Sequence, residues 1–368
     1  MSRHPVRSLS RRLPKALAPS DRPTRLPHVE FDASAVRFLG DAVDPDVFPV
    51  SAAELWHTCD GSRPLDSWEP ADRERIARWH AAGLVVAVPA PRTAPVRALT
   101  FLSPHPDDAQ LALGSTVFRF GGRVVDVFSD ETWTRRPYYR ERPALASRML
   151  IEEERVSCRV LGAGLTLLGH LDGESRPAWR DGFLLGAEST VDVRRAEPEL
   201  FERVVLDLAR ELADPSLVLV PLAVGGHVDH VVTREAVCEL VVRGAVAPER
   251  IVFYEDMPYS LFGDPQADAD RLAAVLSGRP SGPWGGCALT PVLVPGSALS
   301  TEAKREALWP YRLQVMEPIT NRIVRYGRGL GADGPAAGTN ATAGGFAERV
   351  WAPAESVAAV RELAACAT

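Results

Sequence analysis

The sequence predicts an α/β fold: a Rossmann-like, mostly parallel sheet with helices on both faces, preceded by a small winged-helix-like α+β module. From residue 98 onward, short apolar stretches of strand length alternate with longer segments of helix length. Such alternation is typical of a parallel sheet whose two faces are both covered by helices. The chain has 368 residues, of which 46% are hydrophobic and 24% are charged, as in ordinary globular proteins.

The overall charge and composition exclude several classes of protein. A formal net charge of -6 gives no sign of a nucleic-acid partner. No apolar run approaches the roughly 18 residues that a membrane span requires. The five cysteines are scattered without a CxxC pair, which favours reduced thiols in the cytoplasm. We therefore expect a cytoplasmic protein that binds neither nucleic acid nor membrane.

Two proline-rich stretches mark the expected domain boundaries. Residues 1–28 are rich in arginine, proline and serine, and they lack the apolar core of a secretory signal. We expect them to form a disordered basic tail. Residues 91–97 are expected to be a linker. The expected domains are therefore a small module at 29–90 and a larger domain at 98–368.

Residues 29–90 have the order of helix, turn, helix and strand that is typical of a short winged-helix unit. We expect a helix at 50–59, an Asp-Gly turn at 60–61, a second helix at 70–82 and a strand at 84–88. The second helix mixes acidic and basic residues. It is therefore unlike the positive face that binding to nucleic-acid phosphates requires.

Residues 50–88 resemble the PqqD-like peptide-recognition module. The resemblance rests on the stretch LWHTCDGSRPL at 55–65 and on GLV at 83–85. It implies that the module binds a peptide or a protein partner. A small packing or dimerisation domain is the alternative interpretation of the same residues.

The larger domain opens with a strand that ends in side chains able to bind a metal. Residues 99–102 are a short apolar run, and prolines on both sides of His105 force the chain to turn after it. Asp107 and Asp108 complete the turn, directly before a predicted helix. Alternatively, either aspartate could serve only as the N-cap of that helix.

A second strand, residues 217–221, is followed by a loop of the same kind. Residues 225–230 have the sequence Gly-Gly-His-Val-Asp-His and lead into a predicted helix from about residue 231. Ligands of open α/β sheets bind outside the carboxyl ends of the strands. We therefore expect the two loops to meet there and to share one site.

His105, Asp108 and His230 are a chemically suitable set of ligands for one divalent metal. Two imidazoles and one carboxylate suit catalytic zinc, with positions left for water and substrate, and they also suit Fe(II). Asp107 then lies beside the metal, where a carboxylate can take a proton from water that the metal acidifies. Asp107 is therefore the candidate general base.

His227 and Asp229 lie on the same loop as His230. We expect Asp229 to accept a hydrogen bond from His227 and to keep that imidazole protonated. An imidazolium near the metal would stabilise the oxyanion of a tetrahedral intermediate or protonate a leaving amine. Together these residues suit metal-assisted hydrolysis of an amide.

Two motifs of the larger domain resemble those of a known enzyme family. SPHPDD at 103–108 and GHVDH at 226–230 are similar to the signature motifs of the PIG-L/LmbE-like zinc-dependent deacetylases, and the resemblance extends over residues 97–320. It implies a Rossmann-like fold, one zinc ion per chain, and removal of N-acetyl groups, usually from amino sugars or natural-product glycosides. The resemblance implies the same metal ligands and base as above, with His227 assisting the oxyanion or the leaving group. Ala109 departs from the pattern, because many members have an acidic residue there.

Other candidate substrate contacts follow two further predicted strands. Arg135, Arg136 and Tyr138 lie in one such loop, and a solvated surface loop is the alternative interpretation. Asp256 and Tyr259 follow another strand, where they would line the rim of the pocket or cap a helix.

The end of the chain is expected to contain little regular structure before its last elements. Residues 327–345 are rich in glycine, alanine and threonine, and we expect a mobile loop there. Residues 350–351 are expected to belong to an edge strand.

We expect the protein to be a zinc-dependent hydrolase. It would remove an N-acetyl or other N-acyl group from an amino sugar or a natural-product intermediate, with a small molecule as its substrate. The alternative is a metal-dependent hydrolase that acts on another bond in a peptide or secondary-metabolite pathway, with the N-terminal module binding a peptide or partner.

Overall fold

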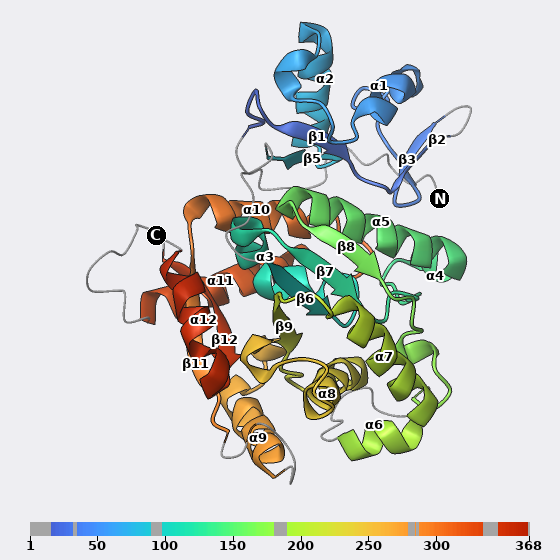
Figure 1. Ribbon diagram of the computed structural model, residues 1–368. Coiled ribbons are helices and arrows are strands. Elements are labelled where there is room, and N and C mark those ends of the chain that lie inside the picture. The colour runs from blue at the N-terminus through green and yellow to red at the C-terminus, as the bar shows by residue number, and fades with distance from the viewer. Residues whose placement is uncertain are drawn as a thin grey trace. The chain divides into compact units, whose positions relative to one another are not determined.

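The computed structural model describes residues 16–31, 35–89, 98–179, 190–278, 284, 287–333 and 345–366 (Figure 1). The chain clusters into two compact units. Unit 1 comprises Met1–Thr93, Thr132–Gly162 and Glu306–Val315, and unit 2 comprises Ala94–Glu131, Ala163–Arg305 and Met316–Thr368. The linker expected at 91–97 lies outside the described residues.

Unit 2 contains a seven-stranded sheet in the order β11-β12-β10-β9-β6-β7-β8. The strands are β6 (Leu99–Ser103), β7 (Arg123–Asp126), β8 (Gly164–Leu167), β9 (Leu217–Pro221), β10 (Ile251–Tyr254), β11 (Thr290–Gly296) and β12 (Phe346–Ala352). The five strands from β10 to β8 are parallel, whereas β12 is antiparallel to both of its neighbours. The predicted α/β fold with a mostly parallel sheet is confirmed.

The order of the parallel strands reverses between β6 and β9. In chain order, the first three strands, β6, β7 and β8, extend in one direction from β6, and β9 and β10 extend in the other. This reversal is the topological switch point of a Rossmann-like sheet, where a crevice opens at the carboxyl ends of the strands. Both expected metal-binding loops follow these two strands.

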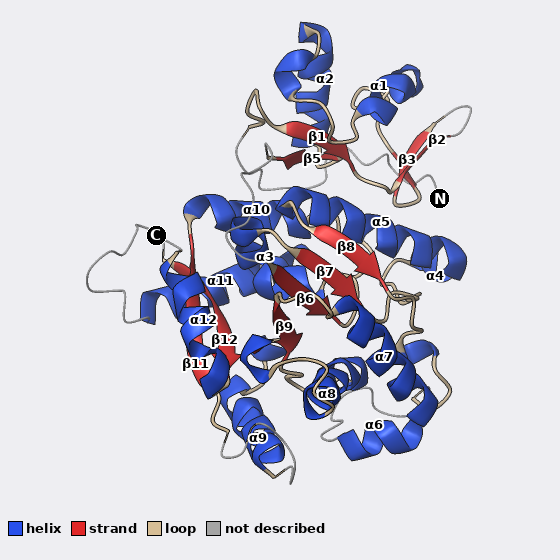
Figure 2. Ribbon diagram, viewed as in Figure 1, coloured by secondary structure: helices blue, strands red, loops and turns tan. Residues whose placement is uncertain are grey.

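The helices of unit 2 flank its sheet or lie at the periphery of the unit (Figure 2). They are α3 (Asp108–Phe120), α6 (Thr190–Ala196), α7 (Pro198–Glu211), α8 (Val228–Val242), α9 (Pro265–Ser277), α11 (Glu317–Asp333) and α12 (Ala354–Ala365), while α10 (Ala298–Leu308) ends in unit 1. Val204 of α7 and Val232 of α8 share one apolar core with Val218 of β9. Because every residue of β6 and β9 is buried, these strands have the continuous apolar sequences of central parallel strands.

The described residues of unit 1 form two small antiparallel sheets and four α-helices, besides the end of α10. β1 (Arg22–Arg25) pairs with β5 (Val85–Val88), and β3 (Val36–Phe38) lies between β2 (Val29–Phe31) and β4 (Asp41–Ala42). The helices are α1 (Ala53–Thr58), α2 (Pro70–Ala81), α4 (Pro137–Arg140) and α5 (Pro143–Leu161). Phe48, Trp56 and Trp79 form an aromatic cluster with ring centroids 4.7 to 5.4 Å apart. The described 3-10 helices are η1 (Val50–Ala52) and η2 (Leu65–Ser67) in unit 1, and η3 (Gly173–Ser175), η4 (Pro248–Arg250) and η5 (Tyr259–Leu261) in unit 2.

The expectation of a disordered tail at 1–28 is wrong for its last part. Residues 22–25 form β1, and Thr24 and Leu26 are buried. A strand of four residues buries too few side chains to produce a visible pattern in a sequence dominated by proline and arginine. Residues 1–15 lie outside the described part of the chain.

Residues 29–90 of unit 1 also pack against residues from near the end of the chain. Within this unit, Trp309 Nε1 donates a hydrogen bond to Gly83 O, and the backbone N–H of Ala87 donates to Glu306 Oε1. Residues from near the end of the chain therefore complete the packing around 29–90.

Two expectations for the end of the chain are corrected. Helix α11 continues through Gly327 and Gly331 as far as Asp333, where a loop was expected; residues 334–344 lie outside the described ranges. A Cβ atom on Gly327 would lie 2.4 Å from Phe346, so glycine permits the helix to approach β12 closely. β12 is an inner strand rather than an edge strand, since β11 pairs with it.

None of the helices in the described ranges has the length and apolarity that crossing a bilayer requires.

Candidate metal centre

The first site loop connects β6 to α3 through a tight, hydrogen-bonded turn. Ser103 Oγ donates to His105 O at 2.6 Å and accepts from the backbone N–H of Ala109 at 3.0 Å. Asp107 occupies the N-cap position of α3 with a φ of 111°, but its side chain makes no capping hydrogen bond. The carboxylate is therefore not used as a simple helix cap.

The second site loop connects β9 to α8. His227 occupies the N-cap position of this helix, and its Nδ1 accepts a hydrogen bond from the backbone N–H of Asp229 at 3.3 Å. Among the described residues other than glycine, only Leu39, Asp107 and Ala223 have a positive φ. Two of these three lie in the site loops. Such conformations persist only where the surrounding structure imposes them, and they gather at functional sites.

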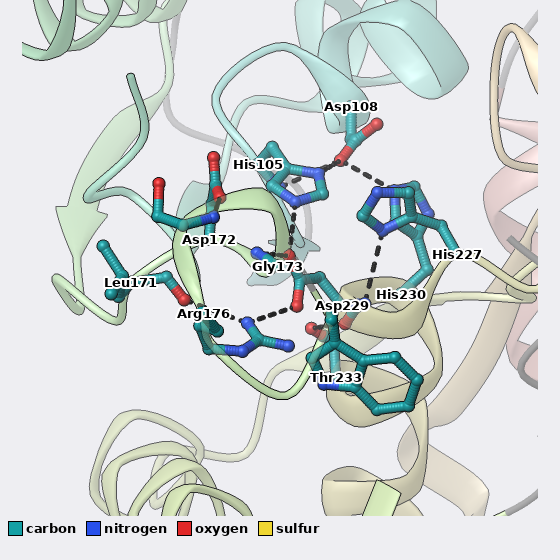
Figure 3. Close-up of polar contacts among 12 residues, drawn as sticks. His105, Asp108, Leu171, Asp172, Gly173, Arg176, His227, Asp229, His230 and Thr233 are labelled. Carbon is teal, nitrogen blue, oxygen red and sulfur yellow. Dashed lines mark hydrogen bonds and ion pairs between the residues drawn. The ribbon is translucent and has the colours of Figure 1, made fainter. Parts of the chain in front are cut away.

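A carboxylate oxygen of Asp108 lies between two imidazoles at the centre of the site (Figure 3). Asp108 Oδ2 is 3.2 Å from His105 Nδ1 and 3.3 Å from His230 Nε2. Two ligands of a tetrahedral zinc ion are about 3.4 Å apart, given metal–ligand bonds of about 2.0–2.2 Å. His230 Nε2 is buried and has no hydrogen-bond partner among the described residues. These atoms therefore fit the ligand shell of a divalent metal.

The second nitrogen of each of these imidazoles faces another carboxylate. His105 Nε2 is 2.9 Å from Asp229 Oδ2, and His230 Nδ1 is 2.5 Å from Asp256 Oδ1. Metal-binding histidines commonly donate their other N–H group to a carboxylate, which fixes the orientation of the ring. The expected pocket-rim residue Asp256 thus lies behind His230.

The charges around the two histidines favour a cation. Burial lowers the pKa of His105, but Asp108 and Asp229 outweigh it and hold that pKa well above its ordinary value. For His230, Asp108 and Asp256 likewise overcome burial and raise the pKa to about 9. Burial raises the pKa of Asp108, but His230 and His105 more than reverse this and lower it strongly. An environment that stabilises protons on both rings would also stabilise a divalent cation.

His227 approaches the same centre from a different environment. Ring nitrogens of His105, His227 and His230 all lie within 4.8 Å of one another, so the three histidines are a possible metal site. Burial, followed by the charges of His105 and His230, lowers the pKa of His227 to about 3. His227 is therefore a neutral imidazole at physiological pH.

The expected pairing of Asp229 with His227 is wrong. The carboxylate of Asp229 contacts His105, the backbone N–H of Gly173 and the guanidinium of Arg176, while His227 receives only the backbone N–H of Asp229. The helix start at residue 228 turns the Asp229 side chain away from its neighbour in sequence. Asp229 and Asp108 act on His227 only through their charges, and these are too weak to offset the burial that lowers its pKa.

The expected substrate contacts fall in two different units. Tyr259 is in unit 2, and its ring centroid lies 5.4 Å from that of His230 and 6.2 Å from that of His227. Arg136 and Tyr138 are in unit 1, where Arg136 Nε donates to Arg312 O and Tyr138 Oη donates to Glu30 Oε2. Arg135, also in unit 1, has its guanidinium over the ring of Trp133. Substrate binding by all four residues stays a prediction.

Sequence reasoning missed Gly173 and Arg176, which both bind Asp229. The available signal was the Asp-Gly pair at 172–173 that follows β8, a third strand ending at the same edge of the sheet. A lone arginine three residues later carried no signal by itself, because its partner is 53 residues away in the chain.

Comparison with known proteins identifies related enzymes. The family model PIG-L, GlcNAc-PI de-N-acetylase, matches residues 100–241. A 2'-N-acetylparomamine deacetylase from Streptomyces fradiae is 30% identical over 275 residues, which cover 69% of this chain and 88% of the relative. Two solved structures of a deacetylase from the teicoplanin biosynthesis pathway match with a TM-score of 0.50, at 22% and 20% identity. Each match covers 70% of this chain and 97% of the other, and supports the fold. None of these matches supports the PqqD-like resemblance of residues 50–88, which stays a prediction.

Proposed function

The chain belongs to the PIG-L/LmbE-like family of deacetylases, which hydrolyse a C–N bond, and we propose that it removes the N-acetyl group from an amino sugar in a small molecule. The observation that carries the proposal is the position of the Asp108 carboxylate between His105 and His230. The relative from Streptomyces fradiae supports the substrate class, because its name specifies an N-acetylated small molecule.

We propose that His105 Nδ1, Asp108 Oδ2 and His230 Nε2 hold one divalent cation, with zinc as the first candidate and Fe(II) as the second. A cation bound there would polarise the carbonyl of the acetamide and make nearby water more acidic. The alternative ligand set replaces Asp108 with His227, whose nitrogen is also within 4.8 Å of the other two histidines.

Asp107 is the proposed general base. It precedes Asp108 directly, is only 8% exposed, and does not cap α3. Its carboxylate would take a proton from the attacking water, while the water oxygen forms a bond to the carbonyl carbon. The protonated Asp107 would then return this proton to the departing nitrogen as the C–N bond breaks, giving a free amine and acetic acid, which ionises to acetate by releasing its proton to the amine or to water.

His227 is proposed to donate a hydrogen bond to the carbonyl oxygen during the reaction. Its Nδ1 accepts the backbone N–H of Asp229, so the proton of the neutral ring resides on Nε2. A neutral imidazole with its N–H group directed into the site can stabilise a developing oxyanion. Asp229 contributes by orienting His105, and Tyr259 is proposed to line the same site beside His227 and His230.

Metal removal tests the proposed function. The purified protein would be treated with a chelator, and acetate release would be measured with 2'-N-acetylparomamine and with N-acetylglucosamine derivatives. We expect chelation to abolish acetate release and added Zn²⁺ to restore it. An Asp108→Asn variant, as a control, should not be restored by Zn²⁺ at the same concentration. Acetate release that persists after complete metal removal would exclude the proposal.

Cytoplasmic localisation and a peptide or protein partner for residues 29–90 stay predictions.

A further inference from the structure

The loop that follows β8 folds around the carboxylate of Asp229, which is itself fully buried. The backbone N–H of Gly173 donates to Asp229 Oδ2 at 2.8 Å, and Arg176 Nη1 donates to Oδ1 at 2.6 Å. Figure 3 shows Asp229 between Arg176 and the imidazole of His105. The carboxylate is therefore held by three partners, two from the loop after β8 and one, His105, from the loop after β6.

Arg176 is itself immobilised. Its side chain is only 4% exposed, and its Nε donates to both oxygens of Glu197, at 3.1 and 2.9 Å. Its Nη1 also donates to Leu171 O at 2.9 Å, and its guanidinium lies 5.0 Å from the ring centroid of Phe128. Arg176 thus forms a rigid bridge between two carboxylates, one of which touches a proposed metal ligand.

The bridge determines which nitrogen of His105 faces the centre of the site. Asp229 Oδ2 forms a hydrogen bond with Nε2 of the His105 ring. The other ring nitrogen, Nδ1, is therefore directed at Asp108. The hydrogen bond made by one nitrogen of a histidine fixes the tautomer and direction of the other. We propose that Arg176 is a positioning residue for the metal site, acting through Asp229 to keep His105 Nδ1 available as a ligand.

Of the two histidines that face Asp108, only His105 is linked to Arg176, through Asp229. Asp256, the carboxylate behind His230, accepts the backbone N–H of Val224 at 2.9 Å. Asp229 likewise accepts a backbone N–H, from Gly173, but it is also bound by a charged side chain, that of Arg176. The planar fork of arginine can donate in several fixed directions, which the single ammonium group of lysine cannot reproduce.

The inference rests on the proposed metal ligands, and metal affinity tests it without any substrate. The dissociation constant for Zn²⁺ would be measured by competition with a chromophoric chelator for the wild type, Arg176→Met and Arg176→Lys. Co²⁺ absorption spectra would report the geometry of the ligand shell. Arg250→Met is the control: Arg250 precedes β10, at the end of the strand opposite the site, and binds the backbone carbonyls of Leu212 and Ser216.

We expect Arg176→Met to weaken Zn²⁺ binding by about 10- to 100-fold, the range found when residues supporting a metal ligand are removed. Arg176→Lys should retain part of the affinity and show an altered Co²⁺ spectrum. Arg250→Met should lower the melting temperature but leave both readouts unchanged. If Arg176→Met fails to fold, Arg176→Lys decides the question.

Two results would overturn the inference. Wild-type Zn²⁺ affinity in Arg176→Met, or in Arg176→Lys if only that variant folds, would refute the role of Arg176 while leaving the proposed function intact. An equal loss of affinity in Arg250→Met would show that general destabilisation accounts for the effect. A wild-type protein that binds no Zn²⁺ would instead overturn the proposed function, and this inference with it.

Discussion

Unit 1 and unit 2 each bury histidine beside a carboxylate, with opposite electrostatic results. In unit 1, His28 Nε2 is 2.6 Å from Glu153 Oε1, and both side chains are fully buried. Burial, followed by the charges of Arg312 and Arg136, keeps the pKa of His28 well below its ordinary value. In unit 2, carboxylates raise the pKa of both His105 and His230.

The difference lies in the number of carboxylates that each histidine faces. His28 faces one, and Glu153 also accepts the backbone N–H groups of Arg312 and Leu313. Burial outweighs these bonds and holds the pKa of Glu153 well above its ordinary value, so both shifts favour the uncharged forms of the pair. His105 and His230 each face two carboxylates and share Asp108. Surplus negative charge, rather than burial, makes the second arrangement suitable for a metal.

Removing the second carboxylate from His230 should weaken the metal site. Asp256→Asn keeps the shape of the side chain but replaces the carboxylate that orients His230. We expect Zn²⁺ affinity to fall by about 10- to 100-fold, as measured by chelator competition. Unchanged Zn²⁺ affinity would show that Asp108 alone is sufficient to make His230 a metal ligand. The number of carboxylates would then not explain the difference from His28.

Breaking the neutral pair in unit 1 should affect stability alone. His28→Leu leaves Glu153 without its side-chain donor and should reduce the free energy of unfolding by about 1–3 kcal/mol, as measured by urea titration. Zn²⁺ affinity should remain at the wild-type value. A large change in affinity would mean that the pair influences the metal site.

The stability difference between wild type and His28→Leu should decrease in acid. The pKa of His28 is lowered in the folded state from its ordinary value of 6.5, so below about pH 6.5 the unfolded chain binds a proton that the folded chain does not. The contribution of His28 to wild-type stability therefore falls as the pH drops through this range, and the variant lacks this contribution. The raised pKa of Glu153 acts in the opposite direction, but Glu153 is present in both proteins. Between pH 7.5 and pH 5.5 the difference should shrink by about 1 kcal/mol. A difference that grows in acid would indicate a charged pair.

The main elements of the site could be predicted from the sequence because each follows an apolar strand directly. His105 and Asp108 come after β6 and His230 after β9, and parallel strands bring their carboxyl ends to one edge of the sheet. The alternation of strands and helices predicted the mostly parallel sheet, whereas the strand order, with the switch point between β6 and β9, comes from the structure.

Other features depend on contacts that a local pattern does not reveal. Arg176 binds Asp229, and Asp256 binds His230. Each contact joins residues of different loops, so neither could be predicted from a local pattern. The side chain of Asp229 turns toward His105 rather than toward His227, two residues away, because α8 begins between them. The glycines of α11 suggested a loop, whereas Gly327 and Gly331 allow the helix to approach the start of β12 closely.

The adjacent aspartates allow the most direct test of the central claim, namely that Asp108 binds the metal and Asp107 moves the proton. The measurement is acetate release per bound Zn²⁺ in Asp107→Asn, an isosteric change to a residue that also tolerates a positive φ. We predict wild-type Zn²⁺ affinity with turnover reduced by about 10²- to 10⁴-fold. Turnover close to wild type in the Zn²⁺-loaded variant would contradict the account.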